Sequence, residues 1–179
     1  HYALDKTWEK KLKPHTKKIM VIDDLADRKH DCDLLLNQNY IHNKSLYNNL
    51  ITPDTIKLLG PKYALLRKDF SRNRETGVHS GSINRVLVFF GGSDLENLTA
   101  IAIKALTKSK LKHLLVDVVI GSANPNQYVL KKEIAKYPNI NLHIQVDNIG
   151  ELMKEADISL GSGGITPWER MSMGLPSIV

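Results

Sequence analysis

The sequence has 179 residues, which is enough for one ordinary domain or for parts of two. Hydrophobic residues make up 42% and charged residues 25%, proportions that allow a real core. The net charge of +6 permits anionic partners, but 6% of the residues are aromatic and no nucleic-acid-binding motif is present, so we expect no nucleic-acid partner. No apolar run approaches the ~20 residues of a membrane span, and the N-terminus does not resemble a signal peptide. We therefore expect no membrane span and a cytoplasmic protein.

The single cysteine, Cys32, excludes a disulfide framework and a zinc site built on cysteines. His30 stands two residues earlier, so the two side chains could form a pair of metal ligands. We favour the other interpretation, a buried thiol beside a strand. We accordingly expect no metal and no cofactor.

Two apolar runs in the first part of the chain predict strands. A helix is expected over Tyr2–Leu12, and Ile19–Ile22 is then a continuous apolar run of the kind that suits a strand covered on both faces of a parallel sheet. Asp23 and Asp24 follow it at once, where open α/β sheets bind ligands. These carboxylates are either substrate or acid–base groups, or caps of the next turn. Asp33–Asn37 repeats the pattern of an apolar strand with a polar end.

The composition changes at residues 71–84 to Ser, Arg, Asn, Gly and His with few apolar side chains, which predicts a linker. We expect residues 1–70 to form the C-terminal part of one Rossmann-like domain and residues 85–179 most of a second. The chain begins with His1 and ends on Ser177–Val179, which resembles the start of a strand. We therefore expect a fragment of a longer protein.

Strands and helices alternate in the second half, which predicts a parallel sheet with helices on both faces. Ser93 and Glu96 have the spacing of a capping box for the first of these helices. The predicted strands are Arg85–Phe90, Leu114–Ile120, Ile140–Val146 and Asp157–Leu160, and the predicted helices lie between and after them.

Three of the turns that follow these strands are rich in glycine and small polar residues: Gly91–Asp94, Gly121–Asn124 and Gly161–Thr166. Such turns gather at the carboxyl edge of a parallel sheet, so the first and third could hold one diphosphate from two sides. Thr166 is expected to be the N-cap of the last helix, with Glu169 three residues later. The fingerprints of NAD sites and of P-loops are absent from the sequence, which argues against NAD binding and ATP hydrolysis.

Several of these segments together resemble the nucleotide-binding half of GT-B glycosyltransferases, in the MurG-like branch that handles UDP-sugars. They are Gly91–Ser93, Asn148–Met153, Ser162–Glu169 and Gly174–Pro176. The resemblance implies an α/β, GT-B-like fold with two Rossmann-like parallel-sheet domains.

A narrower resemblance covers essentially the whole chain. The segments that resemble the nucleotide-sugar hydrolases of pseudaminic acid biosynthesis are His1–Tyr2, Asp23–Asp24, Cys32–Asn37, Gly60–Arg67, Phe70 and Gly91–Asn97. That family implies a UDP-sugar partner, UDP-2,4-diacetamido-2,4,6-trideoxy-β-L-altropyranose, which is hydrolysed to UDP and the free sugar without a cofactor. Direct attack of water on the anomeric carbon would invert its configuration.

The resemblance also implies roles for individual residues. Tyr2 would lie near the sugar, the backbone at Ile149 would read uracil, and Glu169 would accept hydrogen bonds from the ribose hydroxyls. The family's general base is a histidine in a glycine-rich loop that this sequence lacks, and His1 lies in a different motif, so we expect the chain alone to be inactive. The residues implied around the diphosphate are Gly92, Ser93, Asn97, Ser162, Gly163, Gly164 and Thr166.

Some alternatives stay open at this point. The protein could transfer the sugar to a hydroxyl acceptor as a glycosyltransferase, or bind a nucleotide-sugar without turnover. Glu169 could cap its own helix rather than contact ribose, and Arg67 could reach a substrate or form a salt bridge. We expect a monomer.

Overall fold

The computed structural model describes residues 2–43, 45–68, 70 and 81–179 of the chain. It divides into two units, His1–Leu65 and Leu66–Val179. Leu66 and Phe70, which we expected at the end of the first domain, pack in the core of the second unit. Most of the expected linker, at residues 71–80, lies outside the described residues. No helix of the described residues is long and apolar enough to cross a membrane.

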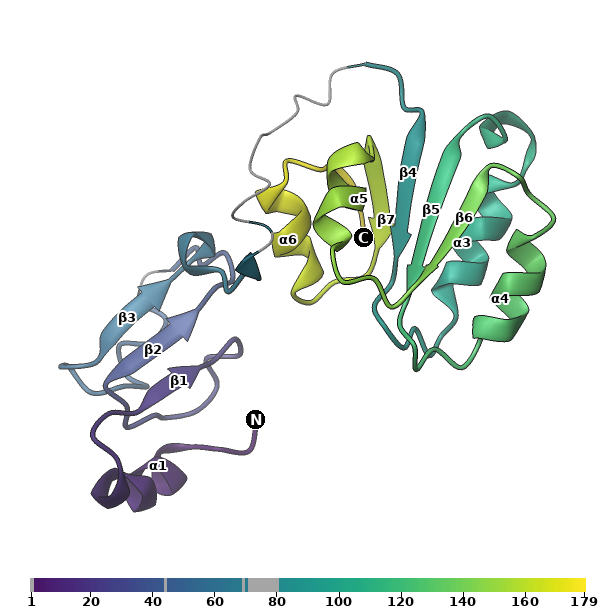
Figure 1. The fold of residues 1–179 in the computed structure, drawn as a ribbon. Coiled ribbons are helices and arrows are strands. Elements are labelled where there is room, and N and C mark those ends of the chain that lie inside the picture. The colour runs from purple at the N-terminus through teal and green to yellow at the C-terminus, as the bar shows by residue number, and fades with distance from the viewer. Residues whose placement is uncertain (1, 44, 69, 71–80) are drawn as a thin grey trace. The chain divides into compact units, whose positions relative to one another are not determined.

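The first unit is built on a parallel sheet in the order β1-β2-β3 (Figure 1). Its helix begins at Lys6 rather than at Tyr2, because the Asp5 carboxylate accepts hydrogen bonds from the backbone amides of Thr7 and Trp8 and so marks the N-cap. The elements are α1 (Lys6–Leu12), η1 (Lys13–His15), β1 (Met20–Ile22), β2 (Leu34–Asn37), β3 (Ile56–Leu59) and η2 (Pro61–Tyr63).

The expectation that the first strand is covered on both faces was wrong. β1 stands at the edge of the sheet, and the side chains of Met20 and Ile22 are 49% and 58% exposed. The central strand β2 carries the buried positions instead, with Leu35 and Leu36 almost fully enclosed. A run of apolar residues therefore predicted the strand but not its place in the sheet.

The second unit contains five parallel strands in the order β6-β5-β4-β7-β8, as the alternation of strands and helices predicted. β4 is the middle strand. β5 and β6 lie on one side of it, and β7 and β8 lie on the other. The elements are β4 (Arg85–Phe89), α3 (Leu98–Leu106), η3 (Ser109–Leu111), β5 (Leu115–Ile120), α4 (Gln127–Ile134), β6 (Ile140–Ile144), α5 (Ile149–Glu155), β7 (Ile158–Gly161), α6 (Thr166–Ser172) and β8 (Ser177–Ile178).

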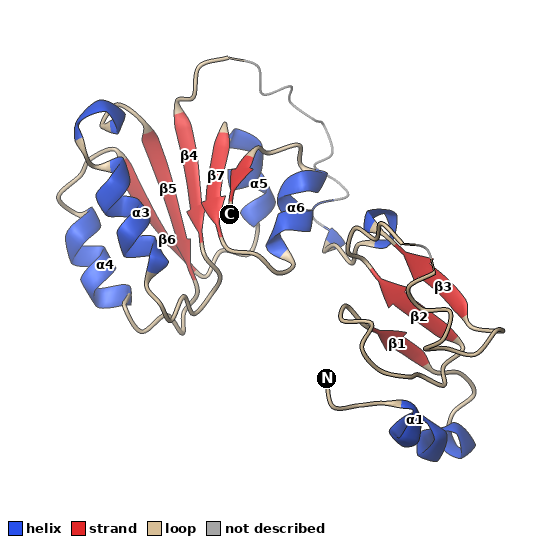
Figure 2. Ribbon diagram, turned by 180° about the vertical axis from the view of Figure 1, so that it is seen from behind, coloured by secondary structure: helices blue, strands red, loops and turns tan. Residues whose placement is uncertain are grey.

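Helices cover both faces of this sheet, α3 and α4 on one side and α5 and α6 on the other (Figure 2). Because side chains alternate along a strand, Val86 and Val88 of β4 pack toward α3 and α4, while Leu87 packs toward α5. Phe70 joins Leu87 in the second of these cores, and both are fully buried. Both faces of the sheet are thus packed, and the turns at its carboxyl edge start from buried strands.

Candidate functional site

The strand order of the second unit reverses between β4 and β7. In open α/β sheets, ligands bind in the crevice outside the carboxyl ends of the strands at such a switch point. The register pairs Phe89, the last residue of β4, with Gly161, the last residue of β7. The turns that follow these two strands therefore start at the same level on neighbouring strands, and they are the two glycine-rich turns that the sequence singled out.

The helix after β4 is capped by a different residue from the one predicted. Ser93 and Glu96 form no capping box, since α3 begins only at Leu98. The buried Asp94 carboxylate instead accepts hydrogen bonds from the amides of Leu98 and Thr99, at 2.9 Å each. Ser93 is exposed, so its hydroxyl is not used to hold the helix.

Close backbone packing fixes the turn after β4 from behind. Gly91 has a φ of +93°, a conformation that glycine adopts without strain. The carbonyl of Gly92 accepts a hydrogen bond of 2.9 Å from the amide of Gly121, in the turn after β5. A Cβ at Gly121 would lie 2.7 Å from that carbonyl oxygen, so the two turns approach this closely only because Gly121 has no side chain.

The turn after β7 is organised by a buried arginine. The Arg170 guanidinium, 1% exposed, donates to the carbonyl of Ser162 at 2.7 Å and lies against Gly161. A Cβ at Gly161 would lie 2.2 Å from Arg170 Nη1 and 2.4 Å from the carbonyl oxygen of Phe89. Gly164 turns the chain with a φ of +89°, and Gly163 is exposed. No pattern in the sequence indicated the part that Arg170 plays here.

The last helix begins one residue away from the predicted position. Thr166 is its first helical residue rather than its N-cap, and the N-cap position is taken by Ile165 without a side-chain cap. Glu169 is 7% exposed, and its Oε1 accepts a hydrogen bond of 3.1 Å from Arg67 Nε. Arg67 thus forms the salt bridge that the sequence left as one of two possibilities.

Unsatisfied polar atoms concentrate near this edge of the sheet. Among the described residues, seven buried side-chain nitrogen or oxygen atoms have no hydrogen-bond partner. Buried polar groups are normally hydrogen-bonded, so each exception marks a place where the fold alone does not satisfy a polar side chain. Five of the seven belong to the turns and helix starts that follow the strands of the second unit, or touch such a turn: Asn97, Thr99, Asn124, Asn148 and Arg170.

Two further residues that the resemblance singled out lie at the starts of helices in the second unit. Asn97 has a φ of +55° and occupies the N-cap position of α3, where its Oδ1 is one of the unpaired atoms. Ile149 is the first residue of α5, and its side chain is buried in the core next to Asn148. The structure therefore brings Gly92, Ser93, Asn97, Ile149, Ser162, Gly163, Gly164, Thr166 and Glu169 into one unit, on or just after the turns at one edge of its sheet.

Tyr2 lies in the first unit, where its hydroxyl donates to Asp24 Oδ2 at 3.1 Å. This hydrogen bond raises the pKa of Tyr2, since the carboxylate favours the protonated phenol. The side chain of Tyr2 is 64% exposed. Asp24 is therefore a partner of Tyr2, which the sequence did not indicate.

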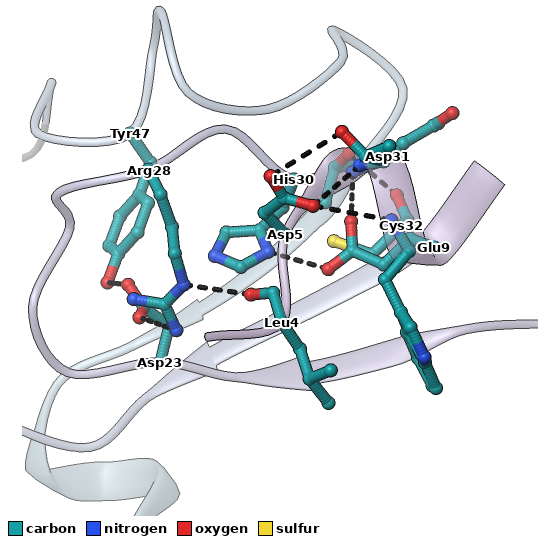
Figure 3. Close-up of polar contacts among 12 residues, drawn as sticks. Leu4, Asp5, Glu9, Asp23, Arg28, His30, Asp31, Cys32 and Tyr47 are labelled. Carbon is teal, nitrogen blue, oxygen red and sulfur yellow. Dashed lines mark hydrogen bonds and ion pairs between the residues drawn. The ribbon is translucent and has the colours of Figure 1, made fainter. Parts of the chain in front are cut away.

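The Asp23 carboxylate caps the turn that follows β1, which was the second of the two interpretations of the sequence (Figure 3). Its carboxylate accepts from the amide of Ala26 at 2.9 Å and from the hydroxyl of Tyr47 at 2.8 Å, and it forms an ion pair with Arg28 at 3.0 Å. Burial raises the pKa of Asp23, but these hydrogen bonds and the arginine outweigh burial, so the pKa is lowered. A carboxylate with all these partners is a structural group.

His30 is paired with the carboxylate of Glu9. His30 Nδ1 lies 2.6 Å from Glu9 Oε1, and the second oxygen of Glu9 accepts from the amide of Asp31 (Figure 3). Cys32 is a free, buried thiol, as expected. No group of three metal-ligating side chains is found in the described part of the chain.

Comparisons with known proteins find three similar curated sequences. The chain is 32% identical over 162 residues to UDP-2,4-diacetamido-2,4,6-trideoxy-beta-L-altropyranose hydrolase of Campylobacter jejuni, which covers 88% of the chain and 55% of that protein. It is 31% identical over 121 residues to the spore coat polysaccharide biosynthesis protein SpsG of Bacillus subtilis, over 67% of the chain and 36% of that protein. An uncharacterized protein of Methanocaldococcus jannaschii, MJ1062, is 33% identical over 138 residues, 70% of the chain and 27% of that protein. No protein-family model matches.

Among solved structures, WaaG, a glycosyltransferase involved in lipopolysaccharide biosynthesis, matches 96% of the chain and 62% of its own length, with a TM-score of 0.46 and 15% identity. The chain spans 27% to 55% of the length of the three curated relatives it matches. It is a distant homologue of proteins of sugar-nucleotide and polysaccharide biosynthesis.

Proposed function

We propose that the second unit binds UDP, and that the protein hydrolyses a UDP-linked diacetamido-trideoxy sugar at its anomeric carbon. The observation that carries the proposal is the pairing of two glycine-rich turns across the switch point, through the register of Phe89 with Gly161. Turns of this kind offer backbone amides to the oxygens of a phosphate group. The homology to a hydrolase of a UDP-sugar supports the choice of nucleotide and of reaction.

Each turn has a distinct part in the proposed site. The amides and hydroxyl of Gly92 and Ser93 would bind the diphosphate from the β4 side, and those of Ser162 to Gly164 from the β7 side. The α6 helix has seven residues, so the turn rather than the helix dipole is the main source of donors. Ile149 would offer its backbone to uracil, and Glu169 its carboxylate to the ribose hydroxyls.

In the proposed reaction, water attacks the anomeric carbon and gives up one proton to a general base, the bond from that carbon to the phosphate oxygen breaks, and UDP leaves with the bonding electrons. Amides that already point at the leaving diphosphate stabilise its developing negative charge without reorganisation. Tyr2 would lie near the sugar. We assign the general base to no residue of this sequence.

Calorimetric titration of the chain with UDP tests the binding step. We expect UDP to bind more tightly than ADP or uridine, because the site would read both the base and the diphosphate. Equal affinity for ADP and UDP, or no heat with UDP at millimolar concentration, contradicts the proposal.

The reaction is tested on a full-length protein that contains this sequence. A hydrolase consumes the UDP-sugar when no acceptor is supplied, whereas a glycosyltransferase requires a hydroxyl acceptor for turnover. NMR of the first-formed free sugar should show inverted configuration at the anomeric carbon. Retained configuration would exclude direct displacement by water.

A further inference from the structure

Arg170 is a buried cation whose hydrogen bonds in the described structure go to neutral oxygens. Its Nη2 donates to the Ser162 carbonyl at 2.7 Å, its Nη1 lies 3.4 Å from Ser159 Oγ, and its Nε has no hydrogen-bond partner. The neighbouring carboxylate, Glu169, already forms an ion pair with Arg67. The group of Arg67, Glu169 and Arg170 therefore carries one positive charge more than its negative charge can balance.

A second arginine of the same unit shows how carboxylates usually balance a guanidinium that is partly buried. Arg85 is 28% exposed at its side chain and forms ion pairs of 2.6 Å with both Asp117 and Glu155. Arg170 is more deeply buried and forms no such ion pair among the described residues; burial lowers its pKa, and the charge of the neighbouring Glu169 offsets this only in part. A buried charge without a counter-charge destabilises the fold, so the position of Arg170 calls for a compensating gain.

The position of the guanidinium fixes the direction of one backbone amide. Arg170 holds the Ser162 carbonyl on its own side of the turn. In a trans peptide the carbonyl and the following N–H point in opposite directions, and the chain has no cis peptide bond among its described residues. The N–H of Gly163 therefore points away from Arg170, on the side where Gly163 is exposed. Gly161 allows this arrangement because it has no Cβ to collide with the guanidinium.

We propose that Arg170 is a positioning residue for a diphosphate: it aims the Gly163 amide outward and supplies, from behind the turn, the positive charge that the ligand balances. This inference rests on the proposed function, which it deepens by assigning the recognition of the phosphates to a side chain that does not touch them. The ligand class is an inorganic or nucleoside diphosphate.

Two arginine variants have opposite expected signatures. Arg170→Met keeps much of the side-chain volume and removes the charge, so affinity for UDP and for inorganic pyrophosphate should fall at least about tenfold while affinity for uridine is retained. Its melting temperature without ligand should not fall, because an unbalanced buried charge is lost. Arg85→Met, the matched control at the other end of β4, should lower the melting temperature and leave UDP affinity unchanged. Arg170→Lys should retain most of the affinity.

Calorimetry and thermal melts of these variants decide the matter. Unchanged UDP affinity in Arg170→Met overturns the inference. An equal loss of UDP and uridine affinity together with a lower melting temperature also overturns it, because that result means that Arg170 has only a structural role. If wild-type chain binds pyrophosphate through Arg170 but does not bind uridine or UDP more tightly, the proposed function fails and the inference stands. If it binds none of the three, both fail.

A measurement on the wild-type chain covers the case in which Arg170→Met does not fold. Pyrophosphate should shift the NMR resonances of the Gly163 amide and of the Arg170 guanidinium, since Arg170 Nη2 donates to the Ser162 carbonyl of the same peptide that carries the Gly163 N–H. The absence of a shift at both, with pyrophosphate bound, overturns the inference.

Discussion

Arg67 and Glu169, which stand 102 residues apart in the sequence, form an ion pair in which Nε donates to Oε1 at 3.1 Å. Arg67 also places its guanidinium 5.1 Å from the centre of the Phe70 ring, and Phe70 is fully buried in the second unit. The segment that contains Arg67 is thus anchored next to the residue that we propose for ribose recognition. The pair has a structural consequence and a functional one.

The structural consequence concerns stability. Arg67→Met leaves the Glu169 carboxylate, whose side chain is 9% exposed, without its cation, so we expect the free energy of unfolding to fall by about 1–2 kcal/mol. The double variant Arg67→Met with Glu169→Gln should be more stable than the sum of the two single losses predicts, since neither partner of this ion pair is then left without the other. Urea denaturation of the four proteins gives this coupling, and strictly additive losses would mean that the ion pair contributes nothing.

The functional consequence concerns the ribose hydroxyls. If Glu169 accepts hydrogen bonds from them, wild-type chain should bind UDP roughly tenfold more tightly than 2′,3′-dideoxy-UDP, and Glu169→Gln should lose most of this preference, because a charge-assisted hydrogen bond becomes a neutral one. Calorimetric titration with both nucleotides measures the ratio. Glu133→Gln, on the exposed side of α4, is the control and should keep the wild-type ratio. A preference that survives in Glu169→Gln excludes the ribose role.

Two neighbouring glycines should respond differently to the same change. A Cβ at Gly161 would lie 2.2 Å from Arg170 Nη1 and 2.4 Å from the Phe89 carbonyl oxygen, so Gly161→Ala should lower the free energy of unfolding by about 3 kcal/mol. A Cβ at Gly163 meets nothing within 4 Å, so Gly163→Ala should change it by less than about 0.5 kcal/mol. Denaturant melts of both variants measure this contrast. Similar stability in the two would show that Arg170 moves aside easily.

Local patterns in the sequence predicted most strands and helices of the second unit, because each depends on side chains a few residues apart. β4 and β5 followed from apolar runs, and the alternation with helices predicted the parallel sheet. The caps were predicted less well. Ser93 and Glu96 match a capping box, but the left-handed conformation of Asn97 delays the start of α3, so the carboxylate of Asp94 reaches the free amides instead.

The contacts that organise the candidate site could not be predicted, because they join residues that the fold alone brings together. The sequence marked the turn at Gly161–Thr166 through its glycines, which have a known conformational use. It did not indicate that Arg170 lies behind that turn, since an arginine in a short helix is normally an exposed residue. The pairing of Arg67 with Glu169 likewise depends on the packing of Phe70 in the second core.

Acid should weaken the second unit through Asp117. Burial raises the pKa of this carboxyl, but the hydrogen bonds from Arg85 and His143 outweigh burial and lower it. A lowered pKa in the folded state stabilises the protein above the unfolded-state value of about 3.9, and this contribution is lost as pH falls through the folded-state value. The stability advantage of wild type over Asp117→Asn should therefore be constant from about pH 5 to 7 and shrink below about pH 4. Urea denaturation at these pH values measures it, and a pH-independent difference would contradict the assignment.

The thiol of Cys32 should be unreactive in the folded protein. Burial, together with the nearby Glu9 carboxylate, raises the pKa of Cys32 to about 11, and its side chain is 3% exposed. At pH 8 roughly one thiol in a thousand is ionised at such a pKa, against about one in four for an unperturbed cysteine. Ellman's reagent should therefore react slowly with native protein, at a rate that rises about tenfold per pH unit between pH 7 and 10, and react fully at once in denaturant. A fast reaction of the native thiol at pH 8 would mean that the first unit opens readily around Glu9 and His30.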